Sequence, residues 1–187
     1  MKIIALAISF FVILFCNAQT NNLPLLDKSP MDMSYYPVNY PVLKIQDKAT
    51  EPVLARVIYS RPQKTGRLIF GDLIEYGKVW RMGANEATEI DFYKNVRIGG
   101  KKISKGRYTL YAIVTPETWT IIINKDVDIW GAFKYDPQKD VLRVGVPTEK
   151  IGNVVEALAM VFEKTDKGCN LIIAWDNIKV SLPISLK

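Results

Sequence analysis

Six residues between two strand-like stretches carry side chains that could do chemistry. They are Arg81–Glu86, with the sequence RMGANE, and they follow an apolar run that ends at Trp80. Arginine presents a planar fork of hydrogen-bond donors, asparagine both donates and accepts, and glutamate accepts hydrogen bonds or acts as a general base. Arg81, Asn85 and Glu86 therefore have the residue types of a polar binding cleft.

The same six residues also fit a purely structural role. Gly83 would supply an unusual backbone angle, and Asn85 tolerates one. Glu86 would pair with Arg81 or with Arg61 and so hold a corner of a sheet together. The sequence leaves both interpretations open.

A second segment, Asn124–Asp140, combines aromatic and acidic residues in a loop-like stretch. Trp130 lies beside Gly131, so an exposed indole that stacks on a sugar ring is one interpretation, and Tyr135 follows in the same loop. Long loops at one end of a rigid β-sandwich often carry binding residues, so we expect Ser60–Glu86, which contains the first segment, and Asn124–Asp140 to meet at one rim. The candidate ligand-binding residues are Arg61, Arg81, Asn85, Glu86, Trp130 and Tyr135.

The composition excludes several classes of enzyme. The chain has no histidine, which excludes serine–histidine and cysteine–histidine catalysis and histidine-based zinc sites. Asp126 and Asp128 could bind calcium, but the fuller ladder of ligands of a calcium loop is missing. We therefore assign no catalytic residue, no metal ligand and no cofactor, and we expect Cys169 to be a small buried residue.

The amino terminus has the pattern of an export signal. Residues 1–18 contain one lysine, an apolar run from Ile3 to Phe15 and then short residues. The run is shorter than the roughly 20 residues that a membrane-spanning helix needs, and no second run of that length follows, so we predict no transmembrane span. We predict cleavage after Ala18 and an exported protein of the periplasm, the outer-membrane surface or the medium. A lipid anchor at Cys16 is the less favoured alternative, because Phe15 is not the small residue that usually precedes a lipidated cysteine.

The remaining chain reads as one β-domain. We expect residues 19–43, which hold four prolines, to form an irregular lead-in, and residues 44–187 to form a single domain. About nine or ten short strands at hairpin spacing predict an all-β fold, an antiparallel β-sandwich or jelly-roll-like barrel. Glu89–Phe92 lies in one such alternating strand, and the glycine pair at 99–100 is the centre of a predicted hairpin. One or two short helical turns are expected, one of them at Asp72–Tyr76, and Asp166–Gly168 and Asp176–Asn177 are predicted turns.

The formal charge of +6 is modest and spread along the chain. Its densest basic run, Lys101, Lys102, Lys105 and Arg107, flanks a glycine turn as solvated hairpin ends do. Neither an arginine-rich helix nor a basic-aromatic RNA-binding signature is found, so nucleic acid is not a predicted partner.

Several motifs together resemble one known family. They are SRP…GR.IFG.L..YG.VWR.GANEAT, GG.....G.Y.L, W...INK..D.WGA..YD...DVLRV and LIIAWDNIKVSLPI, spread from about Val53 to Ile184. This combination resembles the secreted bacterial domain of unknown function, family 2911. The resemblance implies a β-rich exported domain, and it implies no reaction, substrate or catalytic residue.

The expected function is therefore a non-enzymatic binding or interaction module of the bacterial envelope. Its expected partner is a glycan, a small anionic ligand or another envelope protein. The alternative is a histidine-free hydrolase that acts on a glycan or a similar envelope substrate through paired carboxylates, for instance Glu86 with Asp72 or Glu75.

Overall fold

The computed structural model describes residues 23–186, and almost all of their regular structure is β-strand. Two short helices interrupt the series of strands. The elements in chain order are β1 (Met31–Tyr36), α1 (Tyr40–Ile45), β2 (Ala55–Ser60), β3 (Val79–Trp80), β4 (Glu89–Phe92), β5 (Val96–Ile98), β6 (Lys101–Ile103), β7 (Gly106–Val114), β8 (Thr118–Asn124), the 3-10 helix η1 (Pro137–Lys139), β9 (Asp140–Thr165) and β10 (Gly168–Ser185).

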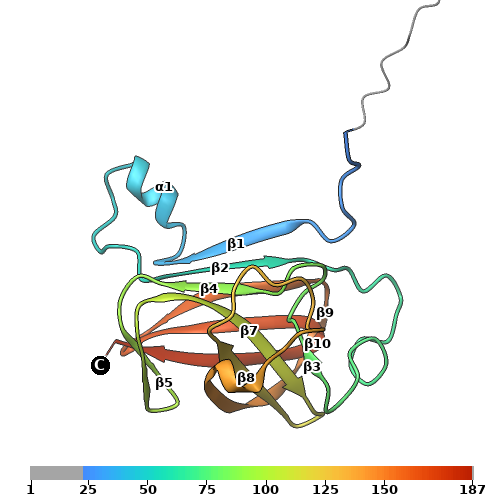
Figure 1. Cartoon of the computed structure of the whole chain (residues 1–187). Coiled ribbons are helices and arrows are strands. Elements are labelled where there is room, and N and C mark those ends of the chain that lie inside the picture. Colours follow the sequence, from blue (N-terminus) through green and yellow to red (C-terminus); the bar gives the residue numbers. More distant parts are fainter. Residues whose placement is uncertain (1–22, 187) are drawn as a thin grey trace, which may run out of the picture.

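The strands form one antiparallel path that folds into two layers (Figure 1). Its order is β1-β2-β4-β7-β8-β9-β10-β5-β6, with β3 added beside β7. Strand β9 passes from one layer to the other, because residues 140–147 pair with β8 whereas residues 148–165 pair with β10. The predicted all-β, sandwich-like fold is confirmed.

Strand β10 doubles back on itself near its middle. At about 3.3 Å per residue, residues 168 and 184 of a straight strand would be about 50 Å apart. Instead, a Cβ atom on Gly168 would overlap the carbonyl oxygen of Ile184, and the Leu186 amide donates to the Lys167 carbonyl at 3.1 Å. The reversal lies at Asp176, whose φ is 55° and where the register against β9 shifts. The predicted turn at Asp176–Asn177 is therefore confirmed, and β10 consists of two arms, residues 168–175 and 178–185.

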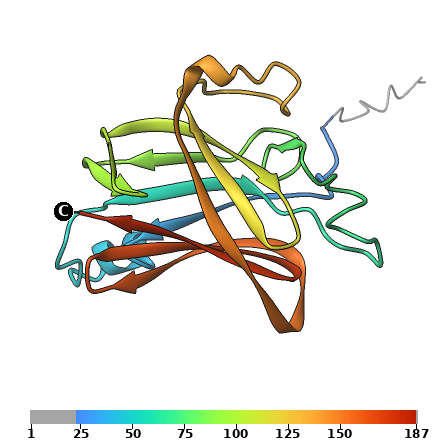
Figure 2. The same ribbon diagram turned by 90° about the horizontal axis from the view of Figure 1, so that it is seen from below.

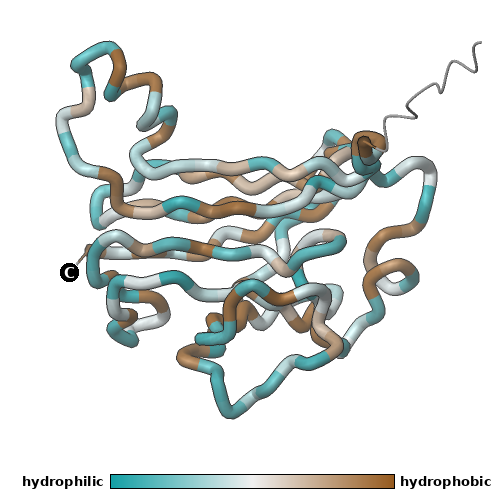
Figure 3. Tube along the Cα trace, turned by 45° about the horizontal axis from the view of Figure 1, so that its top comes forward, coloured by the Kyte–Doolittle hydropathy of each residue, from teal (hydrophilic) through white to brown (hydrophobic). Residues whose placement is uncertain are grey.

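Alternating side chains of both layers fill the core. In β4, for example, Ile90 and Phe92 are buried whereas Glu89 and Asp91 point outward, as the two-residue period of a strand requires. Polar and apolar residues accordingly alternate along the strands in Figure 3. Near one end of the core, four rings pack in edge-to-face, tilted or stacked pairs with centroids 5.1–6.4 Å apart: Phe70, Trp80, Trp119 and Trp175. Cys169 is buried, as predicted.

The segment expected to be an irregular lead-in contains regular structure. Strand β1 pairs with β2 over six residue pairs, from Met31–Ser60 to Tyr36–Ala55, and α1 begins within the same segment. The strand was missed because its run is short and prolines flank it. The helix α1 begins with a proline in its first turn, which suits that position because a first-turn amide has no partner inside the helix.

The expected helical turn at Asp72–Tyr76 is not a helix. Gly71 and Gly77 have φ values of 95° and 76°, and the chain between them forms turns. Glycine at both ends fixes left-handed backbone conformations that a helix cannot continue through.

The longest helix within residues 23–186 is α1, with six residues, and none there is long and apolar enough to cross a membrane. The predicted signal peptide and Cys16 lie outside the described residues. The described chain begins at the end of the molecule that carries the loop of residues 61–78, whereas α1, the β5–β6 hairpin and the carboxy terminus lie at the opposite end (Figures 1 and 2).

Candidate functional site: an anchored rim with exposed aromatic rings

The backbone after β3 turns a tight corner that side-chain hydroxyls hold in place. Ser60 Oγ accepts a hydrogen bond from the Ala84 amide at 2.7 Å and donates to the Ala84 carbonyl. Thr88 Oγ1 donates to the Met82 carbonyl at 2.7 Å, and the Trp80 indole donates to the Gly83 carbonyl at 3.3 Å. Ser60, Met82 and Thr88 are fully buried, so these bonds satisfy backbone groups that water cannot reach.

Gly83 is needed at this corner for close approach rather than for an unusual angle. The positive φ values belong to Met82 and Asn85, both at 57°. A Cβ atom on Gly83 would lie 2.9 Å from Ser60 Oγ and 3.4 Å from the Ser60 carbonyl oxygen. The unusual backbone angle predicted for Asn85 is confirmed, whereas the one predicted for Gly83 belongs to Met82 instead.

The corner lies directly against the loop that carries Trp130. Glu86 and Trp130 form an antiparallel bridge, the Gly131 amide donates to the Asn85 carbonyl at 2.9 Å, and the Ala87 amide donates to the Ile129 carbonyl at 2.8 Å. The expectation that Arg81–Glu86 and the Trp130 loop share one rim is therefore confirmed. We call residues 81–87 together with residues 126–136 the rim; its second segment stands out at the top of Figure 2.

A polar network fixes both ends of the rim loop. The Asn124 side-chain amide donates to the Asp136 carbonyl at 3.0 Å and to Asp140 Oδ1 at 2.8 Å. The Tyr135 hydroxyl donates to Asp140 Oδ2 at 2.6 Å and accepts from Arg143 at 2.6 Å. Burial, with a further contribution from the hydrogen bond to Asp140, raises the pKa of Tyr135 to about 12. Tyr135 is thus a structural anchor of the loop.

The loop also covers a second, smaller apolar cluster on the outer face of β7 and β8. Tyr111 and Ile122 are buried there, beneath Ile129, Ala132 and Tyr135 of the loop. The ring of Tyr111 meets that of Tyr135 edge to face at 5.0 Å. This cover explains why β8 carries three successive isoleucines, since both faces of the strand are buried.

Two aromatic rings of the same loop point to solvent. The side chain of Trp130 is 60% exposed and that of Phe133 is 87% exposed, whereas the other three tryptophans are buried. A Cβ atom on Gly131 would lie 2.6 Å from the Phe133 ring, so the missing side chain leaves room for that ring to rest on the backbone. Phe133 was left out of the predicted site, because nothing in its spacing separates it from the half-buried Tyr135.

Arg81 has no partner for the nitrogen nearest its aliphatic stem. Its Nε is buried and makes no hydrogen bond within the described chain, and burial lowers the pKa of the guanidinium. No ion pair joins Arg81 to Glu86 in residues 23–186, and Glu86 is exposed. The prediction that Glu86 pairs with Arg81 or Arg61 to hold the corner is therefore wrong. The hydroxyls of Ser60 and Thr88 hold the corner instead.

Arg61 belongs to the fold rather than to the rim. Its Nη1 binds Asp32 of β1 at 3.0 Å, and its Nε donates to the Leu158 carbonyl of β9 at 3.0 Å. The residue after Arg61 also contacts β9, because the Leu158 amide donates to the Pro62 carbonyl at 3.0 Å. Arg61 thus ties β1 and β2 to the second layer. Asn85 lies on the rim, and its side chain donates to Asp27 at 3.0 Å.

The acidic residues near Glu86 differ from those expected. Glu86, Glu89 and Asp128 line a cavity of about 140 Å³, whereas Asp72 and Glu75 do not. Arg107 binds both Glu89, at 3.4 Å, and Asp128. Asp126, considered above as a calcium ligand, binds Lys139 at 2.8 Å. Two of the three carboxylates at this cavity are therefore occupied by one guanidinium.

The comparisons with known proteins identify the chain by its family alone. Neither the curated proteins nor the solved structures gave a match. Residues 43–184 match the model of the family described as "Protein of unknown function (DUF2911)", so the resemblance seen in the sequence is confirmed and the chain belongs to this family.

Proposed function

We propose that the domain is an exported, non-enzymatic binding module of the cell envelope that holds a glycan against its rim. The observation that carries this proposal is the pair of exposed rings, Trp130 and Phe133, on a loop whose neighbouring side chains anchor it to the sheet. Rigid aromatic side chains give a large contact area and lose little conformational entropy on binding.

The chemistry around the rings suits a sugar. The C–H groups of a pyranose ring form an apolar face that stacks on an indole, and its hydroxyls need hydrogen-bonding partners nearby. Glu86 is exposed beside Trp130 and offers a carboxylate to such hydroxyls. Arg81 and Asn85 lie on the same turn and add donors. Because the leader sequence predicts export, the expected glycan is one of the envelope.

A carboxylate-dependent hydrolase is the second candidate, and the three acidic residues at the small cavity favour it. Glycoside hydrolysis needs two carboxyl groups that flank the bond to be cleaved. The cavity of about 140 Å³ is smaller than the roughly 300–1,000 Å³ of ordinary ligand pockets, and Arg107 occupies two of its carboxylates. Binding without turnover is therefore the better supported function.

A glycan array probed with the secreted form of the protein tests the proposal. We expect a bound glycan to change the fluorescence of Trp130, which is separable because the other three tryptophans are buried. Trp130→Ala should weaken binding about tenfold or more, and Phe133→Ala should also weaken it, since truncating a central aromatic contact usually costs more than 1 kcal/mol.

Tyr93→Ala is the matched control, because Tyr93 is an exposed aromatic residue outside the rim. Equal binding by Trp130→Ala and the unchanged protein would contradict the proposal. Release of sugar fragments that Glu86→Gln abolishes would establish the hydrolase instead. A stoichiometric complex with a purified envelope protein, with no glycan bound, would replace the glycan by a protein partner.

A further inference from the structure

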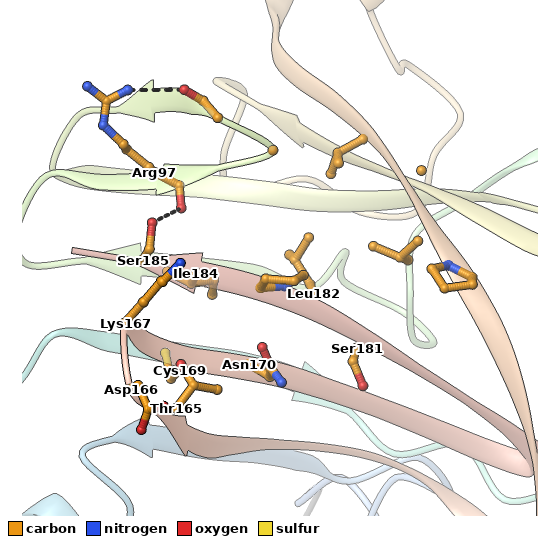
Figure 4. Close-up of a pocket in the computed structure, with 17 residues that line it drawn as sticks. Arg97, Thr165, Asp166, Lys167, Cys169, Asn170, Ser181, Leu182, Ile184 and Ser185 are labelled. Atoms are coloured by element: carbon orange, nitrogen blue, oxygen red, sulfur yellow. Dashed lines mark hydrogen bonds between the residues drawn. The ribbon is translucent and has the colours of Figure 1, made fainter. Parts of the chain in front are cut away.

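A long groove lies away from the rim, where the two layers separate. There β9 leaves β10 to join β8, and the β5–β6 hairpin lies across the opening (Figure 4). Residues 144–147 of β9, the second arm of β10, the turn after β9 and the tip of the hairpin line the groove. Its volume is about 920 Å³, near the upper end of the range for small-molecule sites.

Most of the groove is apolar. Val144 and Pro147 of β9 and Pro183 of β10 are accessible along it, whereas Val146 and Leu182 lie beneath it in the core. Cys169 lies beneath the groove as part of the core, where burial raises the pKa of its thiol to about 12, so that it stays neutral at physiological pH.

One end of the groove is basic. Arg97 and Lys167 lie at that end with Ser185 between them, whereas Leu182 and Ser181 lie farther along (Figure 4). Lys167 is exposed, and its ammonium has no hydrogen bond or ion pair within residues 23–186, whereas Arg97 donates to the Gly100 carbonyl at 3.1 Å. Among the described residues, Asp166 is the single acidic one that lines the groove, so the side chains of the described lining carry a net charge of +1.

The positive charge extends beyond the groove lining. Residues 93–105, which include the β5–β6 hairpin, contain Lys94, Arg97, Lys101, Lys102 and Lys105 and no acidic residue. All five basic side chains are exposed. Their summed field attracts anions to the basic end of the groove, where Lys167 is placed to bind them; the Arg97 guanidinium points away from Ser185 and contributes through this field (Figure 4).

We propose that this groove binds a single-chain anionic amphiphile, such as a long-chain carboxylate. The alkyl chain lies along Val144, Pro147 and Pro183, and the head group lies at Lys167. A neutral apolar ligand would make no use of the basic end, and a small anion would make no use of the apolar length. The ligand enters as a monomer from solution, since the groove holds one molecule rather than the surface of a bilayer.

Isothermal titration of the secreted protein with oleate, below the concentration at which oleate aggregates, tests this proposal. We expect saturable binding with one oleate per chain, and no binding of acetate at the same concentrations. Oleyl alcohol should bind about tenfold more weakly, because it keeps the alkyl chain and lacks the charge. Lys167→Glu should likewise weaken oleate binding about tenfold.

Lys125→Glu is the matched control, because it makes the same change of charge at an exposed lysine that directly precedes the rim segment 126–136 and lies outside the groove. Arg97→Glu should also weaken binding, and Arg97→Lys should retain most of it. If Arg97→Glu loosens the hairpin, Lys167→Glu still tests the proposal, because the ammonium of Lys167 makes no hydrogen bond in the described chain. Equal affinity for oleate and oleyl alcohol, or unchanged oleate binding by Lys167→Glu, would overturn the proposal. Binding to phosphatidylglycerol vesicles without binding of monomeric oleate would overturn it as well.

Discussion

The two sides of the turn after β3 differ in how many of their polar groups make hydrogen bonds or ion pairs within the described chain. On the inner side, Ser60 and Thr88 bond the backbone of Ala84 and Met82, and every one of these residues is buried or nearly so. On the outer side, Glu86 is exposed without an ion pair in the described chain, and Arg81 keeps a buried nitrogen without an acceptor.

This difference separates the residues that build the corner from those that are left over for a ligand. Polar groups that fold a protein are satisfied within it, since an unsatisfied buried group costs about 1–3 kcal/mol. Residues of the inner side should therefore control stability and leave binding intact. Residues of the outer side should do the reverse.

The largest effect is expected at Gly83, where space is most restricted. Gly83→Ala places a Cβ atom 2.9 Å from Ser60 Oγ, and the hydroxyl cannot move without losing its bonds to Ala84. We expect the free energy of unfolding to fall by roughly 2–4 kcal/mol, as overpacking and a lost hydrogen bond add together. Denaturant unfolding measures this change.

Gly152→Ala is the control for Gly83→Ala. A Cβ atom on Gly152 meets nothing within 4 Å, so its stability should change by less than about 0.5 kcal/mol. Equal stability of the two variants would show that the corner is not tightly packed.

A smaller loss is expected from Thr88→Val, which keeps the shape of the side chain and removes the hydroxyl. The Met82 carbonyl then lacks the donor that lies 2.7 Å away, and we expect a loss of about 1–2 kcal/mol in the free energy of unfolding. Thr120→Val on β8 removes a hydroxyl that makes no hydrogen bond within residues 23–186 and should have little effect. If glycan binding fell for Thr88→Val in the folded protein, the division between inner and outer sides would be wrong.

The hydroxyl of Tyr135, which anchors the rim loop, should make the free energy of unfolding depend on pH. Burial raises the pKa of Tyr135 to about 12, above the value of about 10 for an unfolded tyrosine. Between these values the unfolded chain loses a proton that the folded chain keeps, so stability falls as pH rises from about 10 to 12. Tyr135→Phe should make this fall less steep, which unfolding measurements at pH 8 and pH 11 on both proteins can detect. An unchanged slope would mean that the phenol is not held by the loop.

Apart from β1, the sequence was sufficient for most strands and turns because these features are local. Alternation in Glu89–Phe92, the glycine pair at 99–100 and the turn at Asp176–Asn177 each need only neighbouring residues, and each is confirmed. The meeting of Arg81–Glu86 with Trp130 was also predicted, from the general rule that sandwich loops gather at the ends.

Partners distant in the sequence were not predictable. Arg61 binds Asp32 across β1 and β2, and Arg107 binds Asp128 across the rim, and neither pairing follows from spacing. Tyr135 packs on the outer face of β7 and β8, whereas Phe133 is exposed. Which of the two rings packs there depends on the space beside Tyr111 and Ile122, and the sequence does not show that space. The groove beside β10 depends on where β9 changes layers, which alternation within a strand does not encode.

The smallest effect on stability is expected from Arg81→Met, and it tests the comparison most directly. Methionine keeps most of the aliphatic stem and removes a buried guanidinium nitrogen that has no acceptor, so the free energy of unfolding should stay within about 1 kcal/mol or rise. Arg56→Met is the matched change at an ion-paired arginine, because Arg56 binds Asp91 at 2.6 Å. This substitution should lower the free energy of unfolding by about 1 kcal/mol. Glycan binding should show the opposite order, with loss for Arg81→Met and none for Arg56→Met. A protein that is destabilised by Arg81→Met and still binds its glycan would place Arg81 among the residues of the fold and leave the rim with its aromatic rings alone.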